Sequence, residues 1–410
     1  MILVIGGGPA GMMAAAKASE TAEVTLIEKN EKLGKKLFIT GKGRCNLCND
    51  CDDPFFFECL NRNASFMYSS YYSFTIAMLK DFFESRGTPL KVERGDRVFP
   101  KSDKSSDIIK TLEKELRKNK VDIRLNTTVK AIRTAENGYD LVTDKGTIHG
   151  DKIIVATGGM TYRLTGSTGD GYQWAKDFGM GVIKPVAGLV GLRLKEYYLE
   201  ALSGLSLKNV KLTAKTEAGT FTDFGEMLFT HFGISGPIVL SLSLKINRCK
   251  DVALSLDLKP ALDDEVLDKR LLREIGENPN RAIHTMMKQL LPKSLIEPVL
   301  EVAQVPKDLP GHQLTTEMRR ALVHTLKSFP LHYLGLFNEN TGIITTGGVD
   351  VKDVDPSTME SLRAEGIYFC GEVLDVDGPT GGFNLQIAFS TGYLAGMCAG
   401  EEEANEDHSH

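Results

Sequence analysis

The chain has 410 residues, of which 42% are hydrophobic and 25% charged, and its formal net charge is −5. This composition is that of a globular protein, and the length predicts two or three compact units. The negative charge gives no overall bias towards nucleic acid, so a contact of that kind would need a local basic patch. Seven cysteines, an odd number, do not follow a secreted disulfide framework.

The two ends of the chain lead us to expect a cytoplasmic enzyme. The sequence begins MILVIGGG, which already reads as a strand, with no signal peptide before it. No apolar run approaches the roughly 18 residues that a transmembrane helix needs, so we expect no membrane contact. The acidic, polar end EEEANEDHSH is expected to be frayed.

In chain order, the patterning changes twice. Up to about residue 185, short β-branched runs alternate with helical stretches, with a β-meander in the second half. Strand-like runs then dominate to about residue 258, and 262–328 shows apolar positions at helical spacing. After Pro330 the α/β pattern returns. We therefore predict an α/β nucleotide-binding domain interrupted by a β-rich insert with a helical excursion. The predicted bounds are 1–186 and 339–410 for the interrupted domain and 187–338 for the insert, which is β-rich over 187–260 and 331–338 and helical over 261–330.

The strongest motif follows the first strand. Gly6-Gly7-Gly8-Pro9-Ala10-Gly11 contains G-x-G-x-x-G between the strand ILVI and a helix that begins near Pro9, and Glu28 closes the next strand. Gly6 allows the tight turn, Gly8 lets the backbone approach a pyrophosphate, and Gly11 allows close packing of helix on strand. The helix N-terminus favours phosphate, and Glu28 is placed to accept hydrogen bonds from ribose hydroxyls. These features predict a Rossmann-type site for the adenosine half of a dinucleotide.

Two further segments favour FAD over NAD. The strand in 151–159 ends in Ala-Thr-Gly, and the strand in 367–371 ends in Gly371-Glu372, with a glycine-rich loop and a helix starting near Asn384 behind it. In this the sequence resembles the two-dinucleotide-binding-domain flavoproteins of the glutathione reductase superfamily. The resemblance implies that both segments approach FAD and that the last helix directs its N–H groups, around Leu385 and Gln386, at the flavin. A buried packing helix, with Gly392 and Gly396 allowing close contact, is the second interpretation of the same segment.

A closer resemblance covers nearly the whole chain. The string KKLFITGKGRCN at 35–46, the string DRVFPKS at 96–102, the string GEMLFTHFGISGP at 225–237 and the segment 378–386 are similar to the bacterial flavoproteins called YhiN-like or BaiN-like. This resemblance implies FAD-dependent oxidoreduction and an insert of barrel plus helices. Members have been linked to the reduction of carbon–carbon double bonds, in dehydrated bile-acid steroids or in a uridine of ribosomal RNA.

Together, the motifs and the resemblance give a set of expected site residues. The expected FAD-binding residues are Gly6, Gly8, Pro9, Ala10, Gly11, Glu28, Lys29, Lys36, Gly43, Arg44, Cys45, Asn46, Val129, Ala156, Thr157, Gly158, Gly371, Glu372, Gly382, Asn384, Leu385 and Gln386. His231 and Tyr162 are the candidate proton donors, since imidazole and phenol can protonate a substrate carbon after hydride delivery. For each of the two, a turn residue bonded to backbone is the alternative.

The cysteines at 45, 48, 51 and 59 depart from the family pattern, which has only Cys45. Their spacing is compatible with a metal site or with a redox-active disulfide beside the flavin. We expect neither, and interpret them as unpaired thiols of a loop. The basic cluster Lys35, Lys36, Lys42 and Arg44 is expected to be a solvated face with one residue at the pyrophosphate, and docking of an anionic substrate such as RNA is the alternative.

The leading hypothesis for function is an FAD-dependent reductase that delivers hydride from flavin N5 to an activated double bond. A flavin-dependent oxidase of amines or other small molecules and an FAD-containing RNA- or protein-binding module are the alternatives. The segment 166–171 reads G-S-T-G-D-G and lacks the spacing of a second dinucleotide motif. NAD(P)H is therefore expected only as a transient electron donor.

Overall fold

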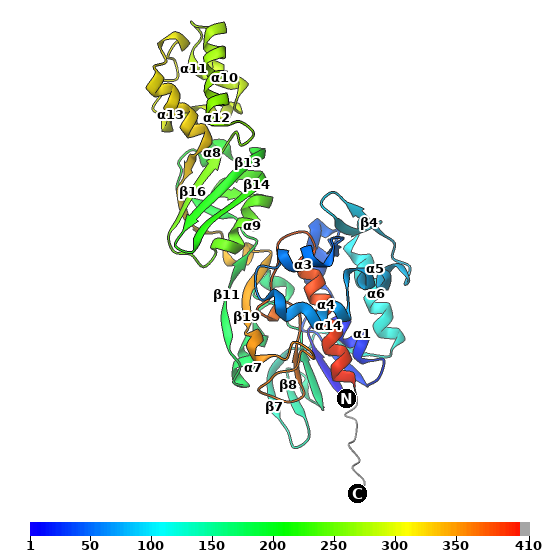
Figure 1. Ribbon diagram of the computed structural model, residues 1–410. Helices are drawn as coiled ribbons and strands as arrows, with labels where there is room; N and C mark the ends of the chain where they lie inside the picture. Colours follow the sequence, from blue (N-terminus) through cyan, green and yellow to red (C-terminus); the bar gives the residue numbers. More distant parts are fainter. Residues whose placement is uncertain (402–410) are drawn as a thin grey trace. The chain divides into compact units, whose positions relative to one another are not determined.

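The computed structural model describes residues 1–401, and the predicted frayed end lies, apart from Glu401, outside the described residues (Figure 1). The chain forms two compact units. The first unit combines Met1–Ala187 with Gly342–His410, and the second unit is Gly188–Thr341. We propose that they are the interrupted domain and its insert.

The first unit is built on a five-stranded sheet. Its order is β20-β10-β1-β2-β6, and all neighbouring pairs are parallel. The strands are Ile2–Ile5 (β1), Val24–Ile27 (β2), Asp122–Arg124 (β6), Lys152–Val155 (β10) and Ile367–Phe369 (β20). The central strands ILVI and VTLI are buried at every position, as expected of a parallel sheet covered on both faces. The predicted α/β, Rossmann-like fold class is confirmed.

Two helices from opposite ends of the sequence pack against each other on this sheet. Helix α1 is Pro9–Ala18 and helix α14 is Phe383–Gly400. A Cβ at Gly392 would lie 2.4 Å from the Ala10 carbonyl oxygen, and one at Gly396 would lie 2.3 Å from that of Ala14. Glycine at these positions therefore allows the close contact that the sequence predicted, and most of α14 is buried.

Smaller elements surround this sheet. Strands β7 (Val129–Thr134), β8 (Tyr139–Thr143) and β9 (Gly146–Gly150) form the predicted meander. A second three-stranded sheet has the order β3-β5-β4, from Cys48–Asn49, Arg97–Pro100 and Leu90–Glu93, and β11 (Val182–Gly188) pairs with β19 (Ile344–Val349). The helices are Lys35–Ile39 (α2), Asp53–Cys59 (α3), Tyr68–Ser73 (α4), Ile76–Glu84 (α5), Ser105–Lys118 (α6) and Asp170–Asp177 (α7).

The second unit contains a seven-stranded sheet of order β17-β16-β13-β14-β15-β12-β18. Its strands are Leu192–Leu194 (β12), Ser206–Thr216 (β13), Gly219–Thr230 (β14), Gly233–Ser235 (β15), Val252–Asp257 (β16), Phe329–Leu331 (β17) and Tyr333–Leu336 (β18). The two edge strands are separated along the chain by His332 alone, so the sheet must curve until its edges approach each other. This gives the insert the barrel-like character that was predicted.

Two helices interrupt the stretch in which strands were predicted to dominate. They are Leu199–Leu202 (α8) and Pro237–Ile246 (α9). The run PIVLSLSLKI alternates apolar residues with Ser as a strand would, but Gly236 and Pro237 start a helix, and its apolar positions are largely buried. A helix buried on most sides has no polar stripe, so periodicity did not reveal it.

The helical excursion lies between β16 and β17, as predicted. Its helices are Asp264–Glu277 (α10), Ile283–Met286 (α11), Lys293–Val302 (α12) and Thr316–Lys327 (α13). The side chains of Asp263 and Thr315 cap α10 and α13 by accepting from the N–H groups of Val266 and Met318. Among the helices that the structure describes, none has the length and apolar character to cross a membrane.

Candidate functional site

The glycine-rich turn between β1 and α1 is built from close backbone approaches. Gly6 has a φ of +109°, and a Cβ there would lie 2.4 Å from the carbonyl oxygen of Ala156. A Cβ at Gly11 would lie 1.9 Å from the carbonyl oxygen of Gly6. Both positions therefore require glycine, and the turn lies directly against the end of β10, where the Ala-Thr-Gly segment begins.

Gly8 differs from its neighbours because a Cβ there would meet no protein atom within 4 Å. It is the N-cap of α1, and Pro9 occupies the first turn without an N–H of its own. The N–H groups of Ala10 and Gly11 belong to the first helical turn, where backbone donors have no partner within the helix. Open space beside N–H donors at the positive end of a helix fits a phosphate group.

Glu28 is fixed at the other side of this turn. Its carboxylate is almost completely buried, and Oε2 accepts from the N–H of Gly7 at 2.7 Å. Oε1 accepts from the backbone N–H and the side-chain amide of Asn30, at 2.8 and 2.7 Å. These bonds position the carboxylate beside the glycine turn, where a ribose would follow a pyrophosphate. The N–H of Thr127 donates to the Glu28 carbonyl, which brings the start of β7 and the buried Val129 next to it.

The third predicted segment reaches the same turn. Gly371 has a φ of +79°, and a Cβ there would lie 2.7 Å from the Cβ of Ala10. Its N–H donates to Thr391 Oγ1 at 2.9 Å, which ties the segment to α14. The N-terminal glycine turn, the Ala-Thr-Gly turn and Gly371 therefore come together, although they are far apart along the chain.

The Ala-Thr-Gly turn also contains a polar atom without a partner. Thr157 Oγ1 is buried and forms no hydrogen bond. Gly158, next along the chain, has a φ of +71°. A Cβ at Gly171 of α7 would lie 2.3 Å from this oxygen, so the hydroxyl is packed against that helix. The open space at Gly8, beside the first N–H groups of α1, is what FAD would require of these segments.

Glu372 is held by a network from three other segments. Lys36 of α2 donates to both carboxylate oxygens, at 2.7 and 3.0 Å, and to Thr161 Oγ1 at 3.0 Å. The N–H of Thr345 donates to Glu372 Oε1 at 2.8 Å, and Thr345 Oγ1 accepts from the N–H of Met160. Lys36 and Glu372 thus form an ion pair, and the N–H groups of the Lys36 ammonium donate to protein oxygens.

The N-terminus of α14 is braced by two asparagines. Asn384 Nδ2 donates to the carbonyl oxygens of Gly378 and Pro379, and its Oδ1 accepts from the N–H of Gly378. Asn46 Oδ1 accepts from the N–H of Gly382 at 3.2 Å, and its Nδ2 donates to the carbonyl oxygen of Cys48. Both side chains therefore fix the loop that leads into α14.

The expectation for Gln386 needs correction. Its N–H donates to the Gly382 carbonyl within the helix, and its buried side chain donates to the Phe74 carbonyl and to Ser390 Oγ. The donors that α14 offers are instead those of its first residues, from Phe383 to Leu385, because the helix begins one residue earlier than expected.

Two cations of the predicted set are directed elsewhere. The Arg44 guanidinium forms ion pairs with Glu93 and Asp103 and stacks over the ring of Phe99 at 4.1 Å. Lys29 Nζ pairs with Asp170 at 2.7 Å. Protein carboxylates thus hold both side chains, and their contact with the cofactor stays a prediction.

Lys35 and Lys36 of the basic cluster are paired with acids as well. Lys35 pairs with Glu31, and Lys36 pairs with Glu372. Lys42, which is exposed, and Gly43, where a Cβ would meet nothing within 4 Å, complete the turn. Acidic partners therefore offset most of this cluster.

Two of the four cysteines are more deeply buried than was expected of thiols in a loop. Cys45 and Cys48 are fully buried, and Cys48 lies in β3. Burial raises the pKa of the Cys45 thiol to about 12 and that of Cys51 to about 11, so both thiols are protonated near neutral pH. Neither Cys45 nor Cys48 forms a disulfide bond. Among the described residues, no three His, Cys, Asp or Glu side chains are grouped to hold a metal ion.

An ion pair and two amide hydrogen bonds that were not predicted clasp the loop before α14. The Arg62 guanidinium contacts both carboxylate oxygens of Asp375, each at 2.6 Å, and Asp375 is almost completely buried. Asn63 Nδ2 donates to the Asp375 carbonyl at 2.6 Å, and Asn61 Nδ2 donates to Asp377 Oδ1 at 2.9 Å. The partners lie more than 300 residues apart, so spacing could not reveal them. Thr345 was also missed, although the paired glycines behind it were a signal of close backbone approach.

The two candidate proton donors lie in different units. Tyr162 belongs to the first unit, has a φ of +53° and follows the Thr161 that contacts Lys36. His231 lies in the second unit, exposed in the turn between β14 and β15. The catalytic role of each stays a prediction.

Comparisons with known proteins identify the family. A family model described as the HI0933-like protein Rossmann domain matches residues 1–398. The chain is 31% identical to the 3-dehydro-bile acid delta(4,6)-reductase of Clostridium scindens, with 97% of this chain and 98% of that protein covered. It is 33% identical to the ribosomal RNA dihydrouridine synthase of Escherichia coli, with 95% and 96% covered.

Among solved structures, one that resembles the chain is 3-ketosteroid delta1-dehydrogenase from Sterolibacterium denitrificans. It has 14% sequence identity and a TM-score of 0.49, with 97% of this chain and 99% of that chain covered. The family match spans nearly the full length, and two relatives exceed 30% identity over most of it. The chain therefore belongs to the HI0933-like Rossmann-domain family, and it is an FAD-dependent oxidoreductase.

Proposed function

We propose that this oxidoreductase is a reductase that saturates a carbon–carbon double bond conjugated to a carbonyl group. One observation carries the proposal. Two relatives with about equal identity have names that describe unlike substrates, a 3-dehydro-bile acid and a ribosomal RNA. A delta-4 double bond beside a 3-oxo group and the ring double bond of uridine are both conjugated to a carbonyl. Reduction of either adds hydride to the far carbon and a proton to the near one.

The residues that would hold FAD follow from the site. The N–H groups of Ala10 and Gly11 would meet the pyrophosphate, Glu28 the adenosine ribose, and the segment of Gly371 the ribityl chain. Bound FAD supplies two-electron chemistry, with hydride donated from N5 of the reduced ring. The first N–H groups of α14, at the positive end of an 18-residue helix, would favour negative charge on the reduced flavin.

The proton in this proposal comes from a side chain. Hydride addition to a conjugated carbonyl leaves an enolate, which a general acid protonates at the carbon next to the carbonyl. Tyr162 is our first candidate because its segment joins the Lys36–Glu372 network. His231 is the second candidate, since a protonated imidazole can donate a proton to carbon. NAD(P)H is the proposed electron donor.

The test separates reduction of the flavin from its reoxidation. FAD-loaded protein is mixed anaerobically with NADH or NADPH, and the loss of the visible flavin band is followed by stopped flow. The reduced protein is then mixed with a 4-en-3-one steroid or with uridine-containing ribosomal RNA. We expect the band to return with one of these acceptors, with the saturated product formed in equal amount. Reoxidation by oxygen alone, with peroxide as product, would show an oxidase and overturn the proposal.

A further inference from the structure

The stretch from Arg86 to Lys120 carries a positive charge that the rest of the chain does not share. It contains 11 Lys and Arg and 6 Asp and Glu, a net charge of +5. Because the whole chain has a net charge of −5, all other residues together carry −10. This stretch covers β4, β5 and α6, which lie on one side of the first unit (Figure 1).

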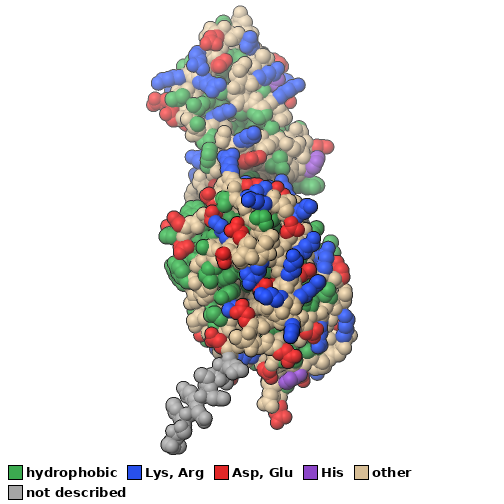
Figure 2. All heavy atoms as spheres, turned by 90° about the vertical axis from the view of Figure 1, so that its right-hand side faces the viewer, with side chains coloured by type: hydrophobic (Ala, Val, Ile, Leu, Met, Phe, Trp, Pro, Cys, Tyr) green, Lys and Arg blue, Asp and Glu red, His purple; other side chains and the backbone are tan. Residues whose placement is uncertain are grey.

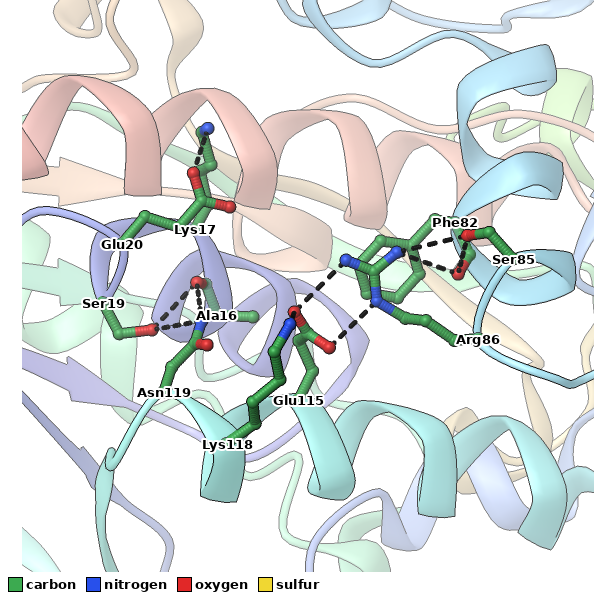
Figure 3. A network of polar contacts seen from close by, with 10 residues as sticks. All are labelled: Ala16, Lys17, Ser19, Glu20, Phe82, Ser85, Arg86, Glu115, Lys118 and Asn119. Carbon is green, nitrogen blue, oxygen red and sulfur yellow. Dashed lines mark hydrogen bonds and ion pairs between the residues drawn. The ribbon is translucent and has the colours of Figure 1, made fainter.

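Half of the acidic side chains in this stretch are already neutralised. Glu93 and Asp103 each pair with both Arg44 and Lys91. Glu115 pairs with Arg86, which stacks on Phe82, and with Lys118, as Figure 3 shows. Asp96, Asp107 and Glu113 are the acids of the stretch that remain outside these ion pairs.

The basic side chains that remain are more numerous, and they are exposed. Eight of them, all within the described part of the chain, form no ion pair: Arg94, Arg97, Lys101, Lys104, Lys110, Lys114, Arg117 and Lys120. The view in Figure 2 faces this side of the unit and shows Lys and Arg side chains gathered on it. The excess of unpaired cations over unpaired acids therefore belongs to one surface, which we call the α6 surface and define by these eight residues.

The local folding explains why these side chains point outwards. Helix α6 buries Ile108, Leu112 and Leu116 against the unit. Lys110, Lys114 and Arg117 follow a spacing of four and three residues and so share its opposite face. Arg94 and Arg97 flank the turn between β4 and β5, where Gly95 and Asp96 have positive φ.

We propose that the α6 surface binds the phosphodiester backbone of a nucleic acid. Lys and Arg that are not neutralised by protein carboxylates bind phosphates with release of counterions. Between residues 86 and 120, all of which the structure describes, Val92 is the single large hydrophobic side chain that is exposed. A helix that lies in a membrane interface buries an apolar face, and a protein interface has an apolar centre. A surface with charge and almost no apolar area fits a polyphosphate chain.

This proposal goes beyond the reduction of a double bond, and its test does not require that reaction to occur. We assume that five of the eight side chains each neutralise one phosphate. A plot of the logarithm of the association constant against the logarithm of the salt concentration should then have a slope of about −3.5 to −4.5. Binding of this kind would be independent of base sequence, because phosphates carry no sequence information.

The experiment compares two variants that remove the same charge. The first is Lys110→Gln/Lys114→Gln/Arg117→Gln on the α6 surface. The control is Lys208→Gln/Lys211→Gln/Lys215→Gln, whose side chains are exposed on β13 of the second unit. An RNA hairpin and a DNA hairpin of the same sequence are titrated with FAD-loaded full-length protein, with fluorescence anisotropy as readout and salt between 50 and 200 mM.

We expect the first variant to bind about 100-fold more weakly near 0.1 M salt, with a slope smaller by about 2, and the control to bind as the parent does. Binding of either hairpin that is lost in the first variant alone supports the proposal, and the hairpin that binds more tightly identifies the source of the phosphates. An unchanged affinity in the first variant, an equal loss in both variants, or no binding of either hairpin would overturn it. Flavin content and reduction by NAD(P)H should not change in the first variant, which separates this test from that of the reductase.

Discussion

Gly8→Asp should remove FAD and yet leave the apo-protein slightly more stable. Gly8 is the N-cap of α1 with extended φ and ψ, the conformation in which an Asp side chain can accept from the first N–H groups of the helix. A new side chain would meet no protein atom, because nothing lies within 4 Å of a Cβ at this position. The substitution therefore affects the ligand and not the fold.

The two effects have opposite signs and can be sized. Asp is better than Gly at an N-cap by a few tenths of a kcal/mol, and the helix dipole adds about as much, so we expect a gain of about 0.5 kcal/mol in the apo-protein. The carboxylate would occupy the place of the pyrophosphate. Two like charges about 4 Å apart repel by about 4 kcal/mol at an effective dielectric constant near 20, or about 1,000-fold in Kd.

The assay uses Gly11→Ala as the matched comparison. Its Cβ would lie 1.9 Å from the Gly6 carbonyl oxygen, so this smaller change should cost about 3 kcal/mol of apo-protein stability. Urea unfolding of both apo-variants and titration with FAD, followed by flavin fluorescence, give the two quantities. If Gly8→Asp binds FAD within tenfold of the parent, or loses more than about 1 kcal/mol of apo-protein stability, the assignment of the pyrophosphate to this turn is wrong.

Three further predictions concern other parts of the first unit. Arg62→Met leaves the buried carboxylate of Asp375 without its partner and should lower the free energy of urea unfolding by about 3 kcal/mol, whereas Arg62→Met/Asp375→Asn should recover part of it; a less stable double variant would contradict this. Because the pKa of Cys45 is raised to about 12, the thiol stabilises the fold fully below its unfolded pKa near 8.5 and progressively less as the pH rises to 12. Between pH 7 and pH 10 the parent should therefore lose about 2 kcal/mol in its free energy of unfolding through this thiol. Urea unfolding at both pH values measures the loss, and Cys45→Ser, which lacks the thiol, should not show it. Tyr162→Phe should slow acceptor reduction about 100-fold while flavin reduction by NAD(P)H keeps its rate in stopped flow, and unchanged turnover would exclude Tyr162 as the proton donor.

The parts of the site that were predictable from the sequence depend on local backbone requirements. Glycine is required at positions 6 and 11 because a Cβ there would clash with a neighbouring backbone carbonyl oxygen. A requirement of this kind can be recognised in the sequence, since it places glycines at fixed spacing between a strand and a helix. Gly371 was found through a resemblance, and the structure explains it by its contact with Ala10. The parallel sheet was predictable for the same kind of reason, since its central strands are continuous apolar runs.

The parts that could not be predicted depend on side chains whose partners are distant in the sequence. Arg44 pairs with Glu93 and Asp103, which lie 49 and 59 residues further along the chain, so the string around Arg44 did not indicate these ion pairs. Arg62 and Asp375 meet across 313 residues. The propensity and periodicity of a single sequence predict its helices and strands. They do not indicate which charged side chains pair across the folded chain.

The way in which the helical excursion joins the second unit has an evolutionary consequence. It leaves the sheet after Asp257 and returns at Phe329, and these points lie on paired strands, since Leu256 and Phe329 are opposite each other in the β16–β17 ladder. A short hairpin turn could bridge the same gap, so the ladder itself places no constraint on how many residues are grafted there. The constraint comes from the apolar side chains that the excursion covers, such as Leu256 and Phe329 of the sheet, which share one core with α13. Homologous chains are thus free to lengthen, shorten or exchange this module, provided that they recover the core they would otherwise expose.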